Sequence, residues 1–179
     1  MKSSRFFFAT LSVAVALAFS SCGPDRQKML SEIEQMEVQL LDPTMAIDST
    51  TVLQLVSLYD QYIENFPDDS MSQVYLYSSA ERMINIGDNE EAVERFNRII
   101  ARYPDYDGIP YCYFFKAFAL EQASRIEEAI NAYEEFLQRY PNHFLADGLR
   151  TTLPLMRQGL DNNGQLKAIL EQKGNATEE

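Results

Sequence analysis

The sequence predicts an all-α protein built from repeated helix pairs, and three observations predict it. The segments YDQYIENFP (59–67), FNRIIARYP (96–104) and YEEFLQRYP (133–141) recur at a spacing of 37 residues. Within each segment, large apolar side chains occupy offsets 0, 3, 4 and 7, which lie on one face of a helix. Each segment ends at a proline, and the residue before a proline is pushed out of the α region. The three segments are therefore interpreted as copies of one helix.

The chain begins with the features of a secretory signal. Lys2 and Arg5 form a small basic region, and an apolar run of 14 residues follows at 6–19. A membrane-spanning helix needs about 20 apolar residues, so this run is too short to be one. Its length and basic flank are typical of a signal peptide, which we assign to residues 1–21.

The signal ends in AFSSC (18–22), which resembles the lipobox of bacterial lipoproteins, with Phe19 where that family usually has Leu. The resemblance implies cleavage before Cys22 and acylation of this cysteine, for example by palmitate, so residues 22–24 would be a lipidated anchor. No cofactor other than this lipid is expected. In familiar lipoprotein sorting systems, Asp directly after the acylated cysteine retains the protein at the inner membrane. This chain has Gly23 there, which favours the outer membrane, with the protein facing the periplasm. Exposure at the cell surface is a further option. The alternative is an ordinary cleaved signal with an incidental cysteine.

Charge and cysteine content narrow the functional classes. Removing Lys2 and Arg5 from the 15 basic side chains leaves 13 against 27 acidic ones, a net charge of −14. A chain this acidic is not expected to bind nucleic acid, or an anionic membrane through a basic patch. If Cys22 is acylated, Cys112 is the only remaining thiol. An internal disulfide is then impossible, and packing must stabilise the fold.

The residues after the anchor divide into four predicted helix pairs. The first pair covers 25–66, and its first helix has apolar side chains at helical spacing, namely Met29, Ile33, Met36 and Leu40. The second pair covers 71–103. There, Gly87 suits a helix C-terminus, and Asp88 with Glu91 predicts a capping box that opens the next helix.

The third pair covers 109–140, and its first helix is strongly apolar. Pro110 is tolerated in the first turn of this helix. Ser124 stands where the preceding pair has a glycine, and together with Glu127 it is predicted to cap the second helix.

The fourth pair covers 143–172 and is less regular than the others. Gly148 and Pro154 are expected to weaken or kink its first helix, and its second helix is predicted to be short. Residues 173–179 are interpreted as a flexible tail, so the repeat domain is assigned to 25–172.

These pairs resemble tetratricopeptide repeats, which place large, small and large residues along a first helix, followed by A-x3-F and a terminal proline. The matching residues are Leu76, Ala80, Met83, Ala92, Phe96 and Pro104 in the second pair, and Tyr113, Ala117, Leu120, Ala129, Tyr133 and Pro141 in the third. The resemblance implies a right-handed superhelix of helix-turn-helix pairs. It also implies that the first helices line a groove for a protein partner.

The family's groove positions predict which side chains line that groove. Carried over to this chain, they include Val74 and Ile84, and the six assigned to the predicted groove are Tyr77, Glu81, Tyr111, Phe114, Phe118 and Glu121. The repeat spacing of 37 residues predicts that Tyr77 and Phe114 lie side by side. The stretch from Tyr111 to Leu120 is apolar nearly all round, so packing of its rings in the core is the alternative.

No catalytic or metal site is predicted. His143, the only histidine, follows a helix-ending proline and is interpreted as a turn residue. Cys112 lies between two tyrosines on an apolar helix, which favours a buried, inert thiol. The alternative class is a small carboxylate- or metal-dependent hydrolase that would use Glu81 and Glu121.

Taken together, the anchor and the repeats predict a non-catalytic adaptor of the bacterial cell envelope. The chain resembles the BamD-like lipoprotein of the outer-membrane β-barrel assembly machine, and it is similar to the periplasmic repeat proteins that accompany the Tol–Pal system. These resemblances imply envelope proteins as partners and a role in outer-membrane protein assembly. An accessory role in Tol–Pal, cell-wall or polysaccharide handling is the alternative, and no small-molecule cofactor is expected.

Overall fold

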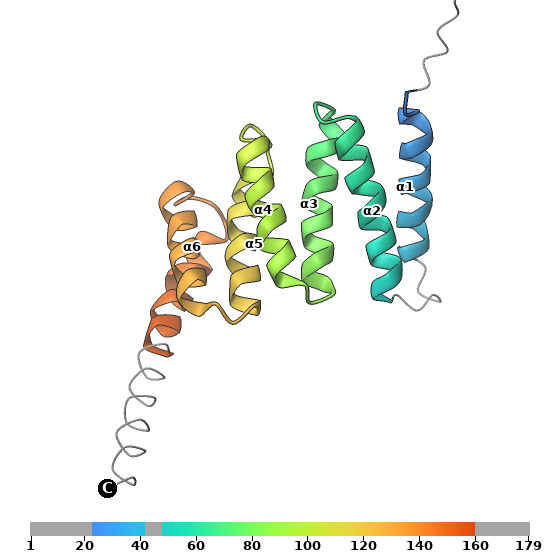
Figure 1. The fold of residues 1–179 in the computed structure, drawn as a ribbon. Helices are drawn as coiled ribbons and strands as arrows, with labels where there is room; N and C mark the ends of the chain where they lie inside the picture. The colour runs from blue at the N-terminus through green and yellow to red at the C-terminus, as the bar shows by residue number, and fades with distance from the viewer. Residues whose placement is uncertain (1–22, 42–47, 160–179) are drawn as a thin grey trace, which may run out of the picture.

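The computed structural model describes residues 23–41 and 48–159, and these residues form a single row of helices (Figure 1). The helices are α1 (Arg26–Leu41), α2 (Ser49–Asn65), α3 (Ser70–Asn85), α4 (Asn89–Arg102), α5 (Ile109–Gln122) and α6 (Ile126–Arg139). A further helical segment covers 146–159. Each of α1 to α5 packs on the next helix along the chain, and α3 also contacts α5. The predicted all-α fold of successive helix pairs is therefore confirmed.

Each helix of the first pair begins at an aspartate that caps its N-terminus. Asp25 accepts hydrogen bonds from the backbone N–H groups of Gln27 and Lys28, and Asp48 accepts one from Thr51 at 2.7 Å. Such caps satisfy N–H groups that have no partner within the helix. The predicted apolar face of α1 is confirmed, since Ile33 and Leu40 are buried and Met29 and Met36 pack partly against the core.

A left-handed residue ends the first helix of the second pair. Gly87 has a φ of +83°, and the N–H of Asp88 then reaches back to the carbonyl of Met83 at 2.9 Å. This geometry is the common glycine-containing end of a helix. Only half of the predicted capping box forms. The Asp88 carboxylate accepts from the N–H of Glu91, whereas the Glu91 carboxylate binds Arg95 instead.

The turn in the third pair repeats that geometry without a glycine. Ser124 has a φ of +62°, and the N–H of Arg125 reaches the carbonyl of Leu120 at 2.9 Å, the bond equivalent to the one before α4. The prediction that Ser124 and Glu127 cap α6 is wrong, because the residue at the cap position is Arg125 and it makes no side-chain capping bond. Ser124 serves the chain reversal, where an L residue is strained.

The helical segment 146–159 is the first helix of the predicted fourth pair. It runs through Gly148 and Pro154, and it buries Ala146, Leu149 and Leu153. The other elements predicted for the ends of the chain lie outside the described residues, namely the signal peptide, Cys22, the last short helix and the tail at 173–179. No helix in the described part of the chain combines the length and the hydropathy that a membrane crossing requires.

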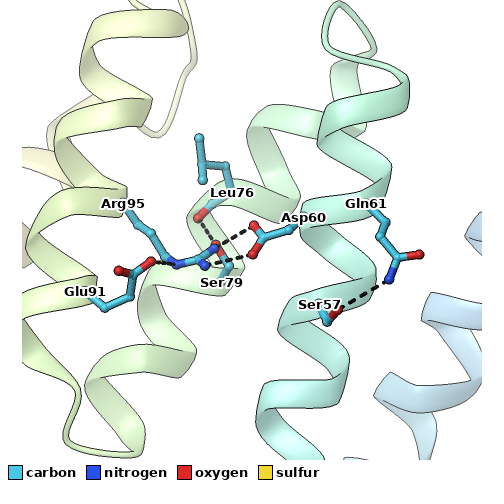
Figure 2. Close-up of polar contacts among 7 residues, drawn as sticks. All are labelled: Ser57, Asp60, Gln61, Leu76, Ser79, Glu91 and Arg95. Atoms are coloured by element: carbon cyan, nitrogen blue, oxygen red, sulfur yellow. Dashed lines mark hydrogen bonds and ion pairs between the residues drawn. The ribbon is translucent and has the colours of Figure 1, made fainter.

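A polar cluster joins the first two pairs (Figure 2). Arg95 on α4 binds both carboxylate oxygens of Asp60 on α2, each at 2.8 Å, and its Nε binds Glu91 at 2.8 Å. Arg95 also donates to the hydroxyl of Ser79 on α3, which itself donates to the carbonyl of Leu76. One guanidinium therefore links three helices.

Candidate peptide-binding groove

Two pockets lie along the first helices of the repeats. The α3–α5 pocket has a volume of about 350 Å³ and is lined by Ser78, Glu81, Arg82, Ile84, Asn85, Phe115 and Phe118. The C-terminal pocket has a volume of about 580 Å³ and lies among α5, α6 and residues 144–156, with Phe114, Glu121, Tyr133, Phe144, Thr152 and Leu155 in its lining. Both volumes fall in the range of ligand pockets in proteins, roughly 300 to 1,000 Å³.

The two pockets are successive copies of one structural feature. A shift of 37 residues converts Ile84 into Glu121, and both line the corresponding wall of their pockets. The same shift converts Phe115 into Thr152 and Phe118 into Leu155 on the facing wall. The repeat therefore generates the same depression twice, and we call the two pockets together the groove.

The structure divides the six predicted groove residues among three places. Glu81 and Phe118 line the α3–α5 pocket, while Phe114 and Glu121 line the C-terminal pocket. Phe114, Phe118 and Glu121 have helical spacing and share one face of α5, and this face contributes to the lining of both pockets. Tyr77 and Tyr111 line neither pocket.

Tyr77 and Tyr111 occupy different surroundings. Tyr77 is half-buried, with its ring centroid 6.0 Å from that of Phe96, 6.2 Å from that of Tyr106 and 6.5 Å from that of Phe115. Tyr111 is 36% exposed, and its ring meets His143 and Phe144 at the edge of the C-terminal pocket.

The predicted pairing of Tyr77 with Phe114 is not what the structure shows. The α5 ring beside Tyr77 is that of Phe115, whereas Phe114 turns toward α6 and meets Tyr133 and Phe136 with centroids 5.6 and 5.7 Å apart. Helix α5 is apolar nearly all round, so its sequence does not indicate which ring faces which neighbour. The alternative of rings packed in the core describes Tyr77 better than Phe114 or Phe118.

Glu81 is the carboxylate of the α3–α5 pocket. Its side chain is half-buried, and this desolvation raises the pKa of Glu81 above 4.5, against the opposing influence of the Tyr77 hydroxyl and Arg82. Within the described ranges, Glu81 forms no ion pair. The pocket therefore contains an acid that is not held in an ion pair, although Arg82 lines the same pocket.

Glu121, in the C-terminal pocket, is bound to the wall of the pocket. It accepts a hydrogen bond from the Tyr133 hydroxyl at 2.9 Å, and burial together with this carboxylate raises the pKa of Tyr133. Because Glu81 and Glu121 line different pockets, they do not form the shared carboxylate pair that a hydrolase would use. In residues 23–41 and 48–159, no group of three or more His, Cys, Asp and Glu side chains is placed to hold a metal ion.

Two further residues singled out from the sequence are packed against the core. Cys112 is fully buried, and desolvation raises the pKa of its thiol to about 12, so the thiol is protonated at neutral pH. His143 lies in the turn after α6, in contact with the rings of Tyr111, Phe136 and Phe144. Neither residue lines the groove.

Sequence reasoning missed the wall of the C-terminal pocket that follows α6. Phe144 and Leu155 are 70% and 64% exposed, and with Leu145, Leu149 and Met156 they provide most of the apolar lining. A second application of the 37-residue shift to the α5 residues would have identified Leu155. Phe144 precedes the helical segment and has no counterpart in that pattern.

A known repeat family matches helices that form the groove. The tetratricopeptide repeat family model matches residues 75–106 and 112–143. The chain carries tetratricopeptide repeats. The two matched segments contain α4 and α6 with most of α3 and α5, which are the helices that form the α3–α5 pocket and one side of the C-terminal pocket.

Solved structures share the arrangement of these tetratricopeptide repeats. The nearly identical TPR-like repeats of a candidate kinesin light chain from Podosopora anserina superpose with a TM-score of 0.50, and a point variant of the same repeats with 0.51. Both are 15% identical to this chain, cover 82% of it, and are themselves covered over 87% and 86% of their lengths. At this identity, the similarity supports only the fold, a helical-repeat superhelix, and indicates no function. The comparison with curated proteins gives no significant match.

Proposed function

We propose that this protein is a non-catalytic adaptor that holds a segment of another protein in the groove. Tetratricopeptide repeats suggest protein–protein interaction, and the groove provides a place for it. The observation that carries the proposal is the repetition of one pocket at the 37-residue pitch, because two equivalent pockets in succession suit a ligand that is itself a chain.

The groove also has the composition of a binding surface. Large exposed apolar side chains usually mark a surface that contacts something else, and aromatic side chains often dominate the energy of such contacts. Phe144 and Leu155 are both largely exposed, and both line the C-terminal pocket beside Phe114. This concentration favours a binding role for the surface formed by α5 and the segment after α6.

We further propose that the adaptor is anchored in the bacterial cell envelope through acylated Cys22. The support is the lipobox-like AFSSC at 18–22 after a signal-like segment. Helix α1 begins at Arg26, so four residues at about 3.5 Å each would keep the repeats within about 14 Å of the lipid. An outer-membrane adaptor, in β-barrel assembly or beside Tol–Pal, is the role that this combination favours.

Photo-crosslinking in intact cells tests the adaptor proposal. A photoreactive phenylalanine analogue at Phe118 or Leu155 should crosslink to one and the same envelope protein, identified by mass spectrometry. The same analogue at Glu94, an exposed position on α4 outside the groove, should not. Equal labelling at all three positions, or no product from the groove positions, would contradict the proposal.

A further inference from the structure

We propose that the groove reads two side chains of its partner: a lysine or arginine in the α3–α5 pocket and a large apolar side chain in the C-terminal pocket. This inference rests on the proposed adaptor function and names the chemistry of the segment that the adaptor holds. It follows from the difference between two pockets that the repeat makes equivalent in position.

The α3–α5 pocket is suited to a cation. The Glu81 carboxylate has no ion pair within the described part of the chain, and the rings of Phe115 and Phe118 line the same pocket. An ammonium or guanidinium group gains from a nearby carboxylate and from the face of an aromatic ring. Ser78 and Asn85 add neutral hydrogen-bonding groups around the acid.

Arg82 does not satisfy Glu81. Although Arg82 lines the same pocket, it makes no ion pair with Glu81, and its charge also acts on the hydroxyl of Tyr59 on α2. That hydroxyl also donates to the carboxylate of Glu37 on α1 at 2.6 Å. The charge of Arg82 therefore acts on groups of both helix pairs, and no ion pair holds it to Glu81, whose carboxylate can accept a partner's cation.

The C-terminal pocket is suited to an apolar group. At the positions equivalent to Phe115 and Phe118 it has Thr152 and Leu155, and Phe114, Phe144 and Met156 add apolar walls. Its one acid, Glu121, already accepts the Tyr133 hydroxyl at 2.9 Å. This pocket is also the larger of the two, at about 580 Å³ against about 350 Å³.

The spacing of the two side chains follows from the repeat. Helices α3 and α5 are in direct contact, and packed helices lie about 8 to 10 Å apart, which sets the distance from one pocket to its copy. A chain in the polyproline II conformation rises about 3.1 Å per residue and returns to the same side every three residues. For a partner segment in this conformation, the basic and apolar side chains should be three residues apart.

Selection from a random peptide library tests this inference without knowledge of the partner. The full-length chain, immobilised through its C-terminus, should enrich peptides in which Lys or Arg lies three residues from Leu, Phe or Met. Glu81→Gln should abolish the preference for Lys or Arg and leave the apolar preference. Leu155→Asp should abolish the apolar preference and leave the basic one. Enrichment of no motif, or of the same motif with all three proteins, would overturn the inference.

A measurement with defined peptides makes the result quantitative. In fluorescence polarisation, a Gly-Ser peptide with Lys and Leu three residues apart should bind the wild type about fivefold more tightly than the same peptide with Gln in place of Lys, since a charge pair near the protein surface contributes up to about 1 kcal/mol. That ratio should fall to about one for Glu81→Gln, whose thermal melt confirms folding. A ratio that persists in Glu81→Gln overturns the cation assignment.

The crosslinking and peptide experiments separate the two proposals. If the groove positions crosslink to an envelope protein but the peptide ratio does not depend on Glu81, the adaptor proposal stands and the inference fails. If the groove positions do not crosslink, the adaptor proposal itself fails.

Discussion

Arg95 on α4 donates two parallel hydrogen bonds of 2.8 Å to the carboxylate of Asp60 on α2, across the width of α3 (Figure 2). The Arg95 side chain is only 11% exposed, and a third bond reaches Ser79 on α3 itself. Such bidentate pairs are among the stronger polar contacts in proteins. The contact fixes the junction of the first two repeats, on which the α3 side of the groove depends.

We expect Arg95→Met to lower the free energy of unfolding by about 2 to 3 kcal/mol, because Asp60 and Ser79 would lose their shared donor in a partly buried site. Lys28→Met is the matched control, since Lys28 and Glu32 form an exposed pair at 3.7 Å. The control should change the free energy of unfolding by less than about 1 kcal/mol. Urea unfolding followed by circular dichroism measures both, and equal values for the two variants would refute the role assigned to Arg95.

Ala129 on α6 is fully buried at the position where the repeat brings its two helices together. Ala129→Leu should overpack this contact and cost about 1 to 3 kcal/mol. Ala101→Leu makes the same enlargement at an exposed position of α4 and should have a small effect. Thermal melting distinguishes the two, and similar midpoints would mean that α5 and α6 do not pack as described.

Ser124 and Gly87 occupy equivalent left-handed turns, with φ of +62° and +83°. Ser124→Gly should raise the free energy of unfolding by about 1 kcal/mol, because glycine adopts this conformation without strain. Gly87→Ser should lower it by a similar amount, and a Cβ at Gly87 would meet no atom within 4 Å, so the effect is one of backbone conformation. Opposite shifts in the melting temperature are expected; shifts of the same sign would contradict the equivalence of the turns.

Glu81 should make stability depend on pH in a defined direction. Burial raises the pKa of Glu81 in the folded state above 4.5, its ordinary value. The folded state therefore holds the proton more tightly than the unfolded state does. Stability from this group is present at low pH and is lost as pH rises through the folded pKa. Glu81→Gln should therefore raise the melting temperature at pH 7, and this advantage should shrink as the pH is lowered toward 4. An advantage that is independent of pH would show that Glu81 is not desolvated.

Cys22→Ala should release the protein from the membrane fraction, since acylation at this position is the proposed attachment. Two or more acyl chains anchor a protein stably, whereas one is marginal. Fractionation of cells, with immunoblotting of the membrane and soluble fractions, measures the change, and Cys112→Ala is the control because Cys112 is buried. Retention of processed Cys22→Ala in the membrane would refute the anchor.

The repeat spacing alone predicted the sequence of helix pairs, because the prolines and the apolar faces of α2, α4 and α6 recur with little ambiguity. The turn at Ser124 was harder to predict. A serine before an acidic first turn is typical of a cap, and only the backbone shows that Ser124 takes the left-handed position that glycine has at 87.

The groove was predicted less completely than the fold. Motif positions identified Glu81, Phe114, Phe118 and Glu121, all of which line a pocket. They could not separate Phe114 from Phe115, because the rotation of α5 between its neighbours decides which ring faces α3. That rotation results from packing on three sides, which a uniformly apolar helix does not encode as a pattern.

The row of helices has a consequence for how the chain folds. Three side-chain bonds between successive pairs join residues 35 or 36 positions apart: Arg95 with Asp60, Arg125 with Glu90, and Tyr103 with the carbonyl of Pro67. A fourth, between Arg26 and Asp69, joins residues 43 positions apart. No long loop has to close before these contacts form, and low contact order is associated with rapid folding. Each pair can dock as soon as the next 37 residues become available. The protein can thus assemble progressively from its N-terminus as the chain emerges, before its last residues have arrived.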